Sequence, residues 1–277
     1  MKALYDKVSG KICKQITRSY STSFSIGINL LHHSIHLPIY SIYGFVRLAD
    51  EIVDSFHDYN KQALLDQFER DTYTSIREGI SLNPVLNAFQ HTVNAYNIEL
   101  DLISTFLHSM RMDLDDIEYD QAAFEKYILG SAEVVGLMCL QVFVEGDKQN
   151  YEKLKPAAMK LGAAFQKVNF LRDLGADYEK LGRSYFPNVD LSDLDENDKA
   201  KIEASIRSDF TEALVGIKAL PKKAKLGVFT AYVYYLNLFR KIAKTPPREI
   251  MNKRIRISNF RKFLLLFKSY YLSQRSL

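Results

Sequence analysis

The stretch Gln166–Pro187, QKVNFLRDLGADYEKLGRSYFP, decides the fold of this chain. It lies in an apolar-periodic helical segment and ends on glycine and proline, which are helix stop signals. At about 100° per residue, Gln166, Asn169, Asp173 and Asp177 fall within an arc of roughly 80° on one helix face. Acids and amides are poorly suited to a buried apolar core, but on one helix face they form an oxygen-rich surface, which is called a wall below. Such oxygen ligands suit a hard cation, for example Mg²⁺.

A similar wall lies earlier, in Tyr43–Asp54, YGFVRLADEIVD; in chain order it is the first wall, and the wall of Gln166–Asp177 is the second. Tyr43, Arg47, Asp50 and Asp54 fall within roughly 60° on the same helical count, and the other positions are largely apolar. Buried carboxylates are costly unless they are paired or bound to metal. Two such helices that face each other would share metal ions across a cavity.

A single D-x-x-x-D on a helix is usually a solvated face, so each wall alone is weak evidence of a metal site. The two walls share one spacing, however, with a polar residue seven positions before the first aspartate in each. The repetition favours the metal interpretation. The hydroxyl-rich stretch 19–25 has two interpretations, because such residues near a helix end can bind phosphate or cap the helix.

These segments resemble the aspartate-rich motifs of the squalene/phytoene synthase family. RLADEIVD (Arg47–Asp54) is similar to the first motif, and NFLRDLGADYEKLGRSYFP (Asn169–Pro187) to the second, which is the more specific match. YSTSF (Tyr20–Phe24) resembles the S-x-S-F element of the family. The resemblance covers nearly the whole chain. It implies an all-α isoprenoid synthase fold, with residues 1–277 in one helical domain around a central cavity.

The resemblance also implies the chemistry, which is Mg²⁺-dependent head-to-head joining of two prenyl diphosphates through a cyclopropyl diphosphate; Mn²⁺ could replace Mg²⁺. It implies these metal ligands: Asp50, Asp54, Asn169, Asp173 and Asp177. The expected catalytic residues are the four aspartates with Tyr43 and Arg47. The expected substrate-binding residues are Ser21, Ser23, Phe24, Tyr127, Gln166, Asn169, Arg172, Arg183, Tyr185 and Arg254. Arg47 is expected to clamp a diphosphate or to form a salt bridge with Asp50 or Asp54.

The substrate has two candidate lengths. We expect a phytoene synthase that uses two twenty-carbon (geranylgeranyl) diphosphates in carotenoid synthesis, partly because no C-terminal membrane anchor is expected. The alternative is a squalene or dehydrosqualene synthase that uses two farnesyl diphosphates, with NADPH only for squalene. A non-catalytic relative acting as an assembly protein would be expected to lose the metal carboxylates, and all four are present.

Composition sets the remaining expectations. No apolar run approaches bilayer length, and two cysteines fit a reducing, cytoplasmic setting. The net charge of +4 hides a basic tail, because the segment from Arg240 to the end carries eleven Lys or Arg and one acid. We expect this tail to bind diphosphate or to make peripheral contact with a membrane. Nucleic acid is not expected, since no recognition motif accompanies the charge.

Periodicity predicts further helices, with no strands. Their expected ranges are 3–20, a long helix from Pro38, 62–78, 85–97, 99–110, 124–143, 151–182, 198–219 and 221–244. The acidic string Asp113–Asp120 lies at a break and is expected to be mostly a solvated loop, although the family resemblance implies a similar M-x-x-D-L element near the substrate entrance. Glu133 departs from the small-residue pattern of the family, and it is expected to alter the local cavity.

Overall fold

The computed structural model describes residues 1–114, 120–181, 186–187, 189, 194–258, 264–265 and 269, and for residues 176–181 only the backbone. Every regular element in this part of the chain is helical. The elements are α1 (Lys2–Tyr20), α2 (Thr22–Asn29), η1 (His33–Ile35), α3 (His36–Asp54), α4 (Lys61–Glu78), α5 (Pro84–Tyr96), α6 (Leu100–Met112), α7 (Gln121–Ile128), η2 (Leu129–Glu133), α8 (Val134–Phe143), α9 (Lys148–Leu181), α10 (Glu196–Ala219), α11 (Lys222–Ala243) and α12 (Pro247–Asn252). The all-α prediction is confirmed.

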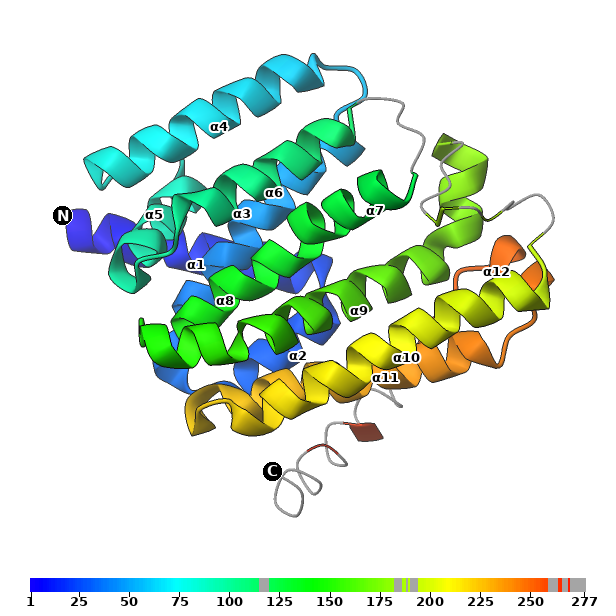
Figure 1. The fold of residues 1–277 in the computed structure, drawn as a ribbon. Helices are drawn as coiled ribbons and strands as arrows, with labels where there is room; N and C mark the ends of the chain where they lie inside the picture. Colours follow the sequence, from blue (N-terminus) through cyan, green and yellow to red (C-terminus); the bar gives the residue numbers. More distant parts are fainter. Residues whose placement is uncertain are drawn as a thin grey trace.

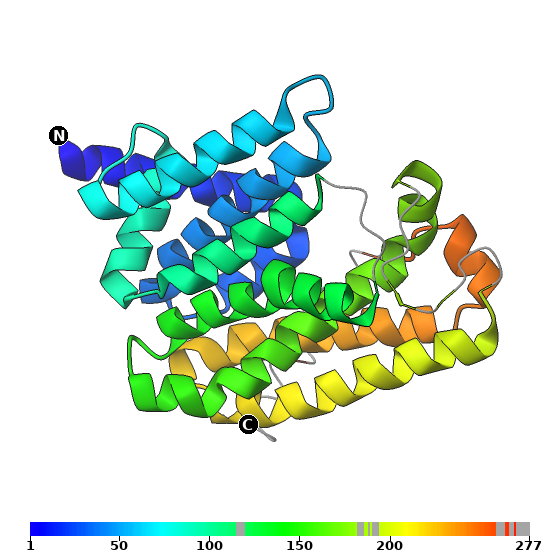
Figure 2. The ribbon, with the colours of Figure 1, turned by 45° about the horizontal axis from the view of Figure 1, so that its top comes forward.

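Helix α9 runs across the molecule and organises the other helices (Figures 1 and 2). It packs against η2 and α8 along one side and against α10 along another, while α11 and α12 also contact it. Helix α3 lies among α1, α4, α5 and α8. The two helices that carry the predicted aspartate walls therefore belong to different neighbourhoods.

Two apolar clusters hold these two helices. The first is drawn mainly from α1 to α8, and in it Phe45 of α3 stacks on Phe89 with ring centroids 3.9 Å apart. The second contains the buried face of α9 with residues of α7, α10, α11 and α12, including Phe210 and Phe239. Because each aspartate helix buries its apolar face in its own cluster, the opposite polar faces keep a fixed position.

Two helix boundaries differ from the sequence prediction. In the stretch 19–25, α1 ends at Tyr20 as expected, but a separate helix α2 then begins, because the Ser21 hydroxyl accepts the Phe24 N–H at 3.2 Å and caps it, in line with the capping interpretation. Helix α3 begins at His36, so Pro38 lies in its first turn, where its missing N–H costs nothing.

The apolar helix predicted over 124–143 is interrupted by the π-helical turn η2. A Cβ on Gly162 of α9 would come within 2.6 Å of the Ala132 carbonyl oxygen of η2, so α9 and η2 meet backbone to backbone. The stretch Gln121–Phe143 is also long and apolar enough to span a membrane by length and composition, against the expectation that no such run exists. Half of its most apolar window is buried against the rest of the fold, as in a core helix.

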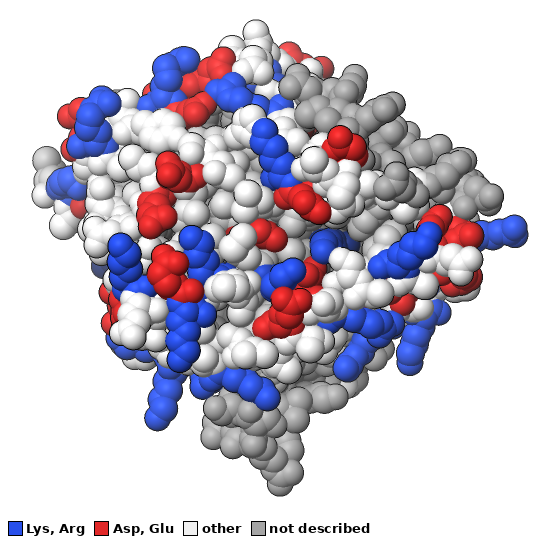
Figure 3. Space-filling view, in the orientation of Figure 1, with Lys and Arg blue, Asp and Glu red and all other residues white. Residues whose placement is uncertain are grey.

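The face that includes α8, α9 and α10 carries charges of both signs. Among the described residues in that view, Lys and Arg alternate with Asp and Glu, without a broad patch of one sign (Figure 3). Such a mixed surface is typical of a solvated face.

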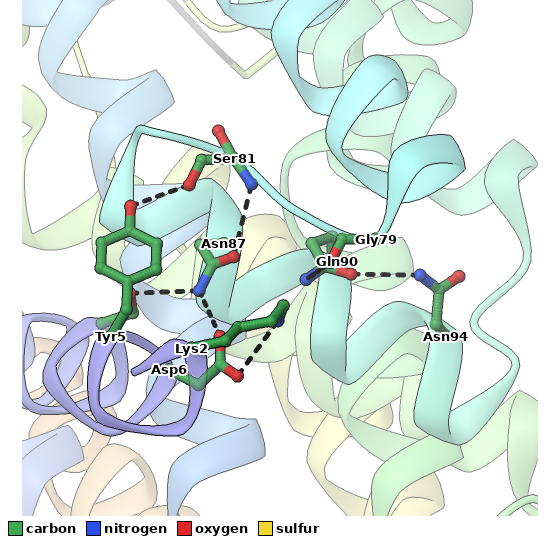
Figure 4. A network of polar contacts seen from close by, with 9 residues as sticks. Lys2, Tyr5, Asp6, Gly79, Ser81, Asn87, Gln90 and Asn94 are labelled. Atoms are coloured by element: carbon green, nitrogen blue, oxygen red, sulfur yellow. Dashed lines mark hydrogen bonds and ion pairs between the residues drawn. The ribbon is translucent and has the colours of Figure 1, made fainter.

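A polar network ties α1 to the start of α5 (Figure 4). The buried Asn87 amide donates to Asp6 Oδ1 at 2.9 Å and to Ser9 Oγ at 3.2 Å, and its oxygen accepts the Ser81 N–H at 3.3 Å. The Tyr5 hydroxyl donates to the Ser81 carbonyl oxygen at 2.8 Å. These bonds fix the N-terminal helix, and through it α3, which packs on α1.

We expect Asn87→Ala to lower the free energy of unfolding by about 2–3 kcal/mol, because it leaves buried partners unsatisfied and opens a small cavity. Urea denaturation at pH 7 measures the change. The hydrogen bond from Asn87, and then that from Lys2, lower the pKa of Asp6. An acid with a lowered folded-state pKa stabilises the fold above its ordinary pKa of 3.8 and loses that contribution as the pH falls. The loss of stability caused by Asn87→Ala should therefore be smaller at acid pH than at pH 7. Asn94→Ala, on the exposed side of α5, is the control; an equal loss there would contradict the assignment.

Candidate active site

In the first wall, Asp50 is partly buried beside other acids. Burial, and then the charge of Asp54, raise the pKa of Asp50 to about 7, while Arg47 opposes the rise. Asp50 nevertheless keeps partial solvent exposure, as do Tyr43 and Arg47 on the same face of α3. A carboxylate held in this way carries an excess of negative charge that a cation would neutralise.

The structure gives Arg47 a partner that neither sequence alternative named. Its guanidinium forms an ion pair with Glu51, one turn along α3, and lies 4.2 Å from the centre of the Tyr20 ring. The expected salt bridge to Asp50 or Asp54 is therefore replaced by an i, i+4 pair. The Arg47 Nε–H is buried and has no hydrogen-bond partner in the described structure. An unsatisfied buried donor is costly, and an anionic ligand would satisfy it.

The second wall is already neutralised at Asp173. Arg172 donates to its two carboxylate oxygens at 3.0 and 2.5 Å, and Arg254 donates to the same two oxygens at 2.7 and 3.2 Å. Asn169 accepts the Tyr235 hydroxyl at 3.4 Å, and Gln166 lies part-buried one turn earlier.

Three predicted site residues cannot be placed as side chains. Asp177 lies in the described backbone of α9, but its side chain is outside the described part, and Arg183 and Tyr185 lie outside the described residues altogether.

Aromatic rings join the two walls. The Phe24 ring of α2 lies 5.7 Å from the Tyr43 ring of the first wall and 6.1 Å from the Tyr235 ring of α11. Tyr235 in turn stacks on Phe165 of α9 at 4.0 Å. Burial raises the pKa of Tyr235 to about 12, so its hydroxyl stays protonated and donates to Asn169. Phe24 therefore lies between the two walls, while Ser21 caps α2 and Ser23 is part-buried in its first turn.

Asp113 is a further candidate site residue, which the family resemblance placed near the substrate entrance although the local sequence favoured a solvated loop. The acidic string was expected to be a solvated loop, but Asp113 is 8% exposed and accepts the Tyr127 hydroxyl at 2.9 Å, while residues 115–119 lie outside the described part. Its charge is among those that raise the pKa of Asp50. The Tyr127 ring lies 5.9 Å from Phe170 of α9. The pair therefore connects the first wall to the second helix, a link that required tertiary structure to see.

We expect Asp113→Asn to lower the rate of product formation by about tenfold or more, because it removes a buried negative charge that would help to attract a metal ion beside Asp50. The amide oxygen can still accept the Tyr127 hydroxyl, so the fold should survive, as circular dichroism would check. Asp101→Asn, an exposed acid of α6, is the control. Equal activity in the two variants would place Asp113 outside the site.

The donors fit a hard cation in type. Asp50 and Asp54 supply carboxylate oxygens beside the buried Asp113, and Asn169 and Asp173 supply oxygens from α9. Within the described residues, however, no three His, Cys, Asp or Glu side chains are grouped closely enough to hold a metal ion.

Glu133, the departure from the expected small-residue pattern, has its charge partners on α9 and α10. Burial raises the pKa of Glu133. The charges of Lys160 and Lys167 oppose this rise, and the charge of Asp209 adds to it. Asp209 of α10 is itself paired with both lysines, at 3.3 and 2.7 Å. The charge of Glu133 therefore acts at the junction of η2 with α9 and α10.

The helical fold is that of the isoprenoid synthases. Residues 17–261 match the family described as squalene/phytoene synthase, and the chain belongs to that family. Its members are prenyltransferases that act on prenyl diphosphates, and this chain is an enzyme of that class.

Particular relatives agree with this membership. The chain is 28% identical to a phytoene synthase of Arthrospira platensis, over 93% of this chain and 91% of that protein. It is 28% identical to the 15-cis-phytoene synthase of Synechocystis sp., over 92% and 82%. A crystal structure of a dehydrosqualene synthase in complex with a ligand superposes with a TM-score of 0.82 at 24% identity, over 97% of this chain and 98% of the other. That structural likeness shows the fold.

Proposed function

We propose that this protein catalyses the Mg²⁺-dependent head-to-head condensation of two geranylgeranyl diphosphates to phytoene. The observation that carries the proposal is the pair of oxygen-rich walls on α3 and α9, joined through the Phe24 ring. The twenty-carbon substrate is supported by the relatives named phytoene synthase, which align over more than nine-tenths of this chain.

The walls would bind the charged ends of the substrates. Asp50, Asp54, Asn169, Asp173 and Asp177 would hold Mg²⁺, which supplies Lewis-acid stabilisation of a leaving diphosphate. The unsatisfied Nε–H of Arg47 would donate to a diphosphate oxygen in a charge-assisted hydrogen bond. These groups are fixed before the reaction by the two apolar clusters, so little reorganisation is needed.

The aromatic rings would contact the prenyl chains of the substrates. Phe24, Phe165 and Tyr235 form a nearly continuous ring surface between the walls. The faces of such rings attract a cation, so they would stabilise the allylic cation left after loss of diphosphate. They also exclude water, which would otherwise capture that cation.

Product analysis tests the proposal. Purified protein with Mg²⁺ is incubated with geranylgeranyl or farnesyl diphosphate, with and without NADPH, and the hydrocarbons and released diphosphate are measured. We expect a forty-carbon product from geranylgeranyl diphosphate and no NADPH requirement. If a thirty-carbon product is the only one formed, the proposed reaction stands but the substrate is farnesyl diphosphate. Release of no diphosphate from either substrate would overturn the proposal.

A further inference from the structure

Asp173 is held by two arginines from different parts of the chain. Arg172 is its neighbour on α9, whereas Arg254 lies 81 positions later and still reaches both carboxylate oxygens. The Asp173 side chain is 20% exposed, so the pairs are partly shielded from water. Both oxygens are engaged, and a carboxylate in that state cannot also ligate a cation without losing a partner.

The segment that carries Arg254 is firmly anchored. Helix α12 packs so closely on α9 that Gly175 lies directly against the Met251 carbonyl. Beyond α12, Ile255 and Ile257 are buried at 4% and 5% exposure. The Arg256 carbonyl oxygen accepts Lys241 Nζ at 2.7 Å. Because alternate residues of this extended segment are buried, Arg254 is left on its open side.

Of the two arginines, Arg254 is the one free to exchange. Its side chain is 46% exposed, whereas that of Arg172 is 20% exposed and lies near Tyr234 and Tyr235. A long arginine side chain can leave one anion for another without movement of its backbone. A diphosphate entering the site offers more negative charge than a single carboxylate and so competes for the guanidinium.

We propose that Arg254 is an exchangeable counter-ion that couples the binding of diphosphate to the binding of metal. In the ligand-free protein it neutralises Asp173 and weakens metal binding at the second wall. Diphosphate draws Arg254 away, and Asp173 becomes available to the cation. This inference rests on the proposed function, because it assumes that metal and diphosphate bind at these walls.

The coupling is reciprocal. If diphosphate strengthens metal binding by a given factor, metal strengthens diphosphate binding by the same factor, and such factors are typically about 5 to 150. Without Arg254, Asp173 keeps only Arg172, so metal alone should bind more tightly. The gain from adding diphosphate should shrink correspondingly.

The experiment measures Mn²⁺ affinity by calorimetry or by electron paramagnetic resonance, with and without inorganic diphosphate. For Arg254→Gln we expect Mn²⁺ alone to bind about five- to tenfold more tightly than to the unaltered chain, with a smaller further gain from diphosphate. Arg254→Lys, which keeps the charge but not the two-pronged contact, should fall between them. Lys253→Gln is the matched control, because it removes the neighbouring charge, which pairs with Glu249.

The outcomes separate this inference from the proposed function. If Arg254→Gln binds Mn²⁺ alone no more tightly than the unaltered chain or Lys253→Gln does, the counter-ion role is overturned. If Mn²⁺ binding with diphosphate persists in that case, the metal-dependent function stands without it. Absence of Mn²⁺ binding to the unaltered chain, with or without diphosphate, would overturn both. If circular dichroism shows that Arg254→Gln does not fold, the Mn²⁺ affinity of Arg254→Lys is compared with the same two proteins instead. An affinity no higher than theirs would overturn the counter-ion role.

Discussion

Asp50→Asn is expected to abolish most product formation while making the metal-free protein more stable. The amide removes a charged metal ligand from the first wall, and the Lewis-acid stabilisation lost with it corresponds to about a thousandfold in rate. Diphosphate release from geranylgeranyl diphosphate measures this effect. Asp58→Asn, an exposed acid beyond the end of α3, should keep full activity.

The stability gain has a defined sign. The folded-state pKa of Asp50, about 7, lies above the ordinary value of 3.8, because the carboxylate is buried and close to Asp54. A raised carboxyl pKa destabilises the fold wherever the group is ionised, so the penalty grows as the pH rises from about 4 to 7. The full interval corresponds to at most about 4 kcal/mol. Asn avoids this penalty.

Urea denaturation without divalent cations, at pH 5 and pH 8, tests the second half of the prediction. Asp50→Asn should exceed the unaltered chain in stability at pH 8, and the difference should narrow at pH 5. A variant that is less stable at both values would show that the Asp50 charge is well compensated. Active sites commonly retain such unfavourable charges because function requires them.

Gly175→Ala is expected to lower the free energy of unfolding by about 2–3 kcal/mol and the melting temperature by about 5–10 °C. Its Cβ would overlap the Met251 carbonyl oxygen, which belongs to the backbone of α12 and cannot turn aside. Either α12 moves away from α9, or α9 bends. Both responses would displace Arg254 from Asp173.

Gly27→Ala is the matched control for this substitution. A Cβ there would meet the Gly227 carbonyl oxygen at 3.6 Å and the Ala231 Cβ at 3.8 Å, which are ordinary contacts. Alanine is also the better helix former, so this variant should equal or exceed the original stability. Scanning calorimetry of the two variants compares them directly. Equal melting temperatures would mean that α12 is not tightly seated on α9.

The sequence predicts both walls because helical periodicity is a local property. Asp50 and Asp54 share a face of α3, and Asn169 and Asp173 share a face of α9, whatever surrounds them. The pairing of Arg47 with Glu51 was equally accessible, since residues four apart on a helix are neighbours. Periodicity does not decide which of the several nearby acids pairs with Arg47.

The remaining site features depend on contacts between distant segments. Asp113 directly follows α6, where no periodic pattern distinguishes a buried acid from a solvated one. Its burial becomes visible only with Tyr127 in place. The pairing of Arg254 with Asp173 depends on the seating of α12 at Gly175, which local sequence does not encode. The helix α2 was missed because serine and threonine signal both a break and a cap.

The order of the site residues along the chain has a consequence for synthesis on the ribosome. Among the described residues, the buried part of the apolar cluster around α3 comes almost wholly from residues 13–154, with Leu220 and Ala224 from later in the chain. Since translation adds about 5–20 residues per second, the first wall can be held in its core seconds before Arg254 emerges. The nascent chain therefore exposes its two aspartate helices without their last counter-charge. We expect the site to be completed only after Arg254 has emerged.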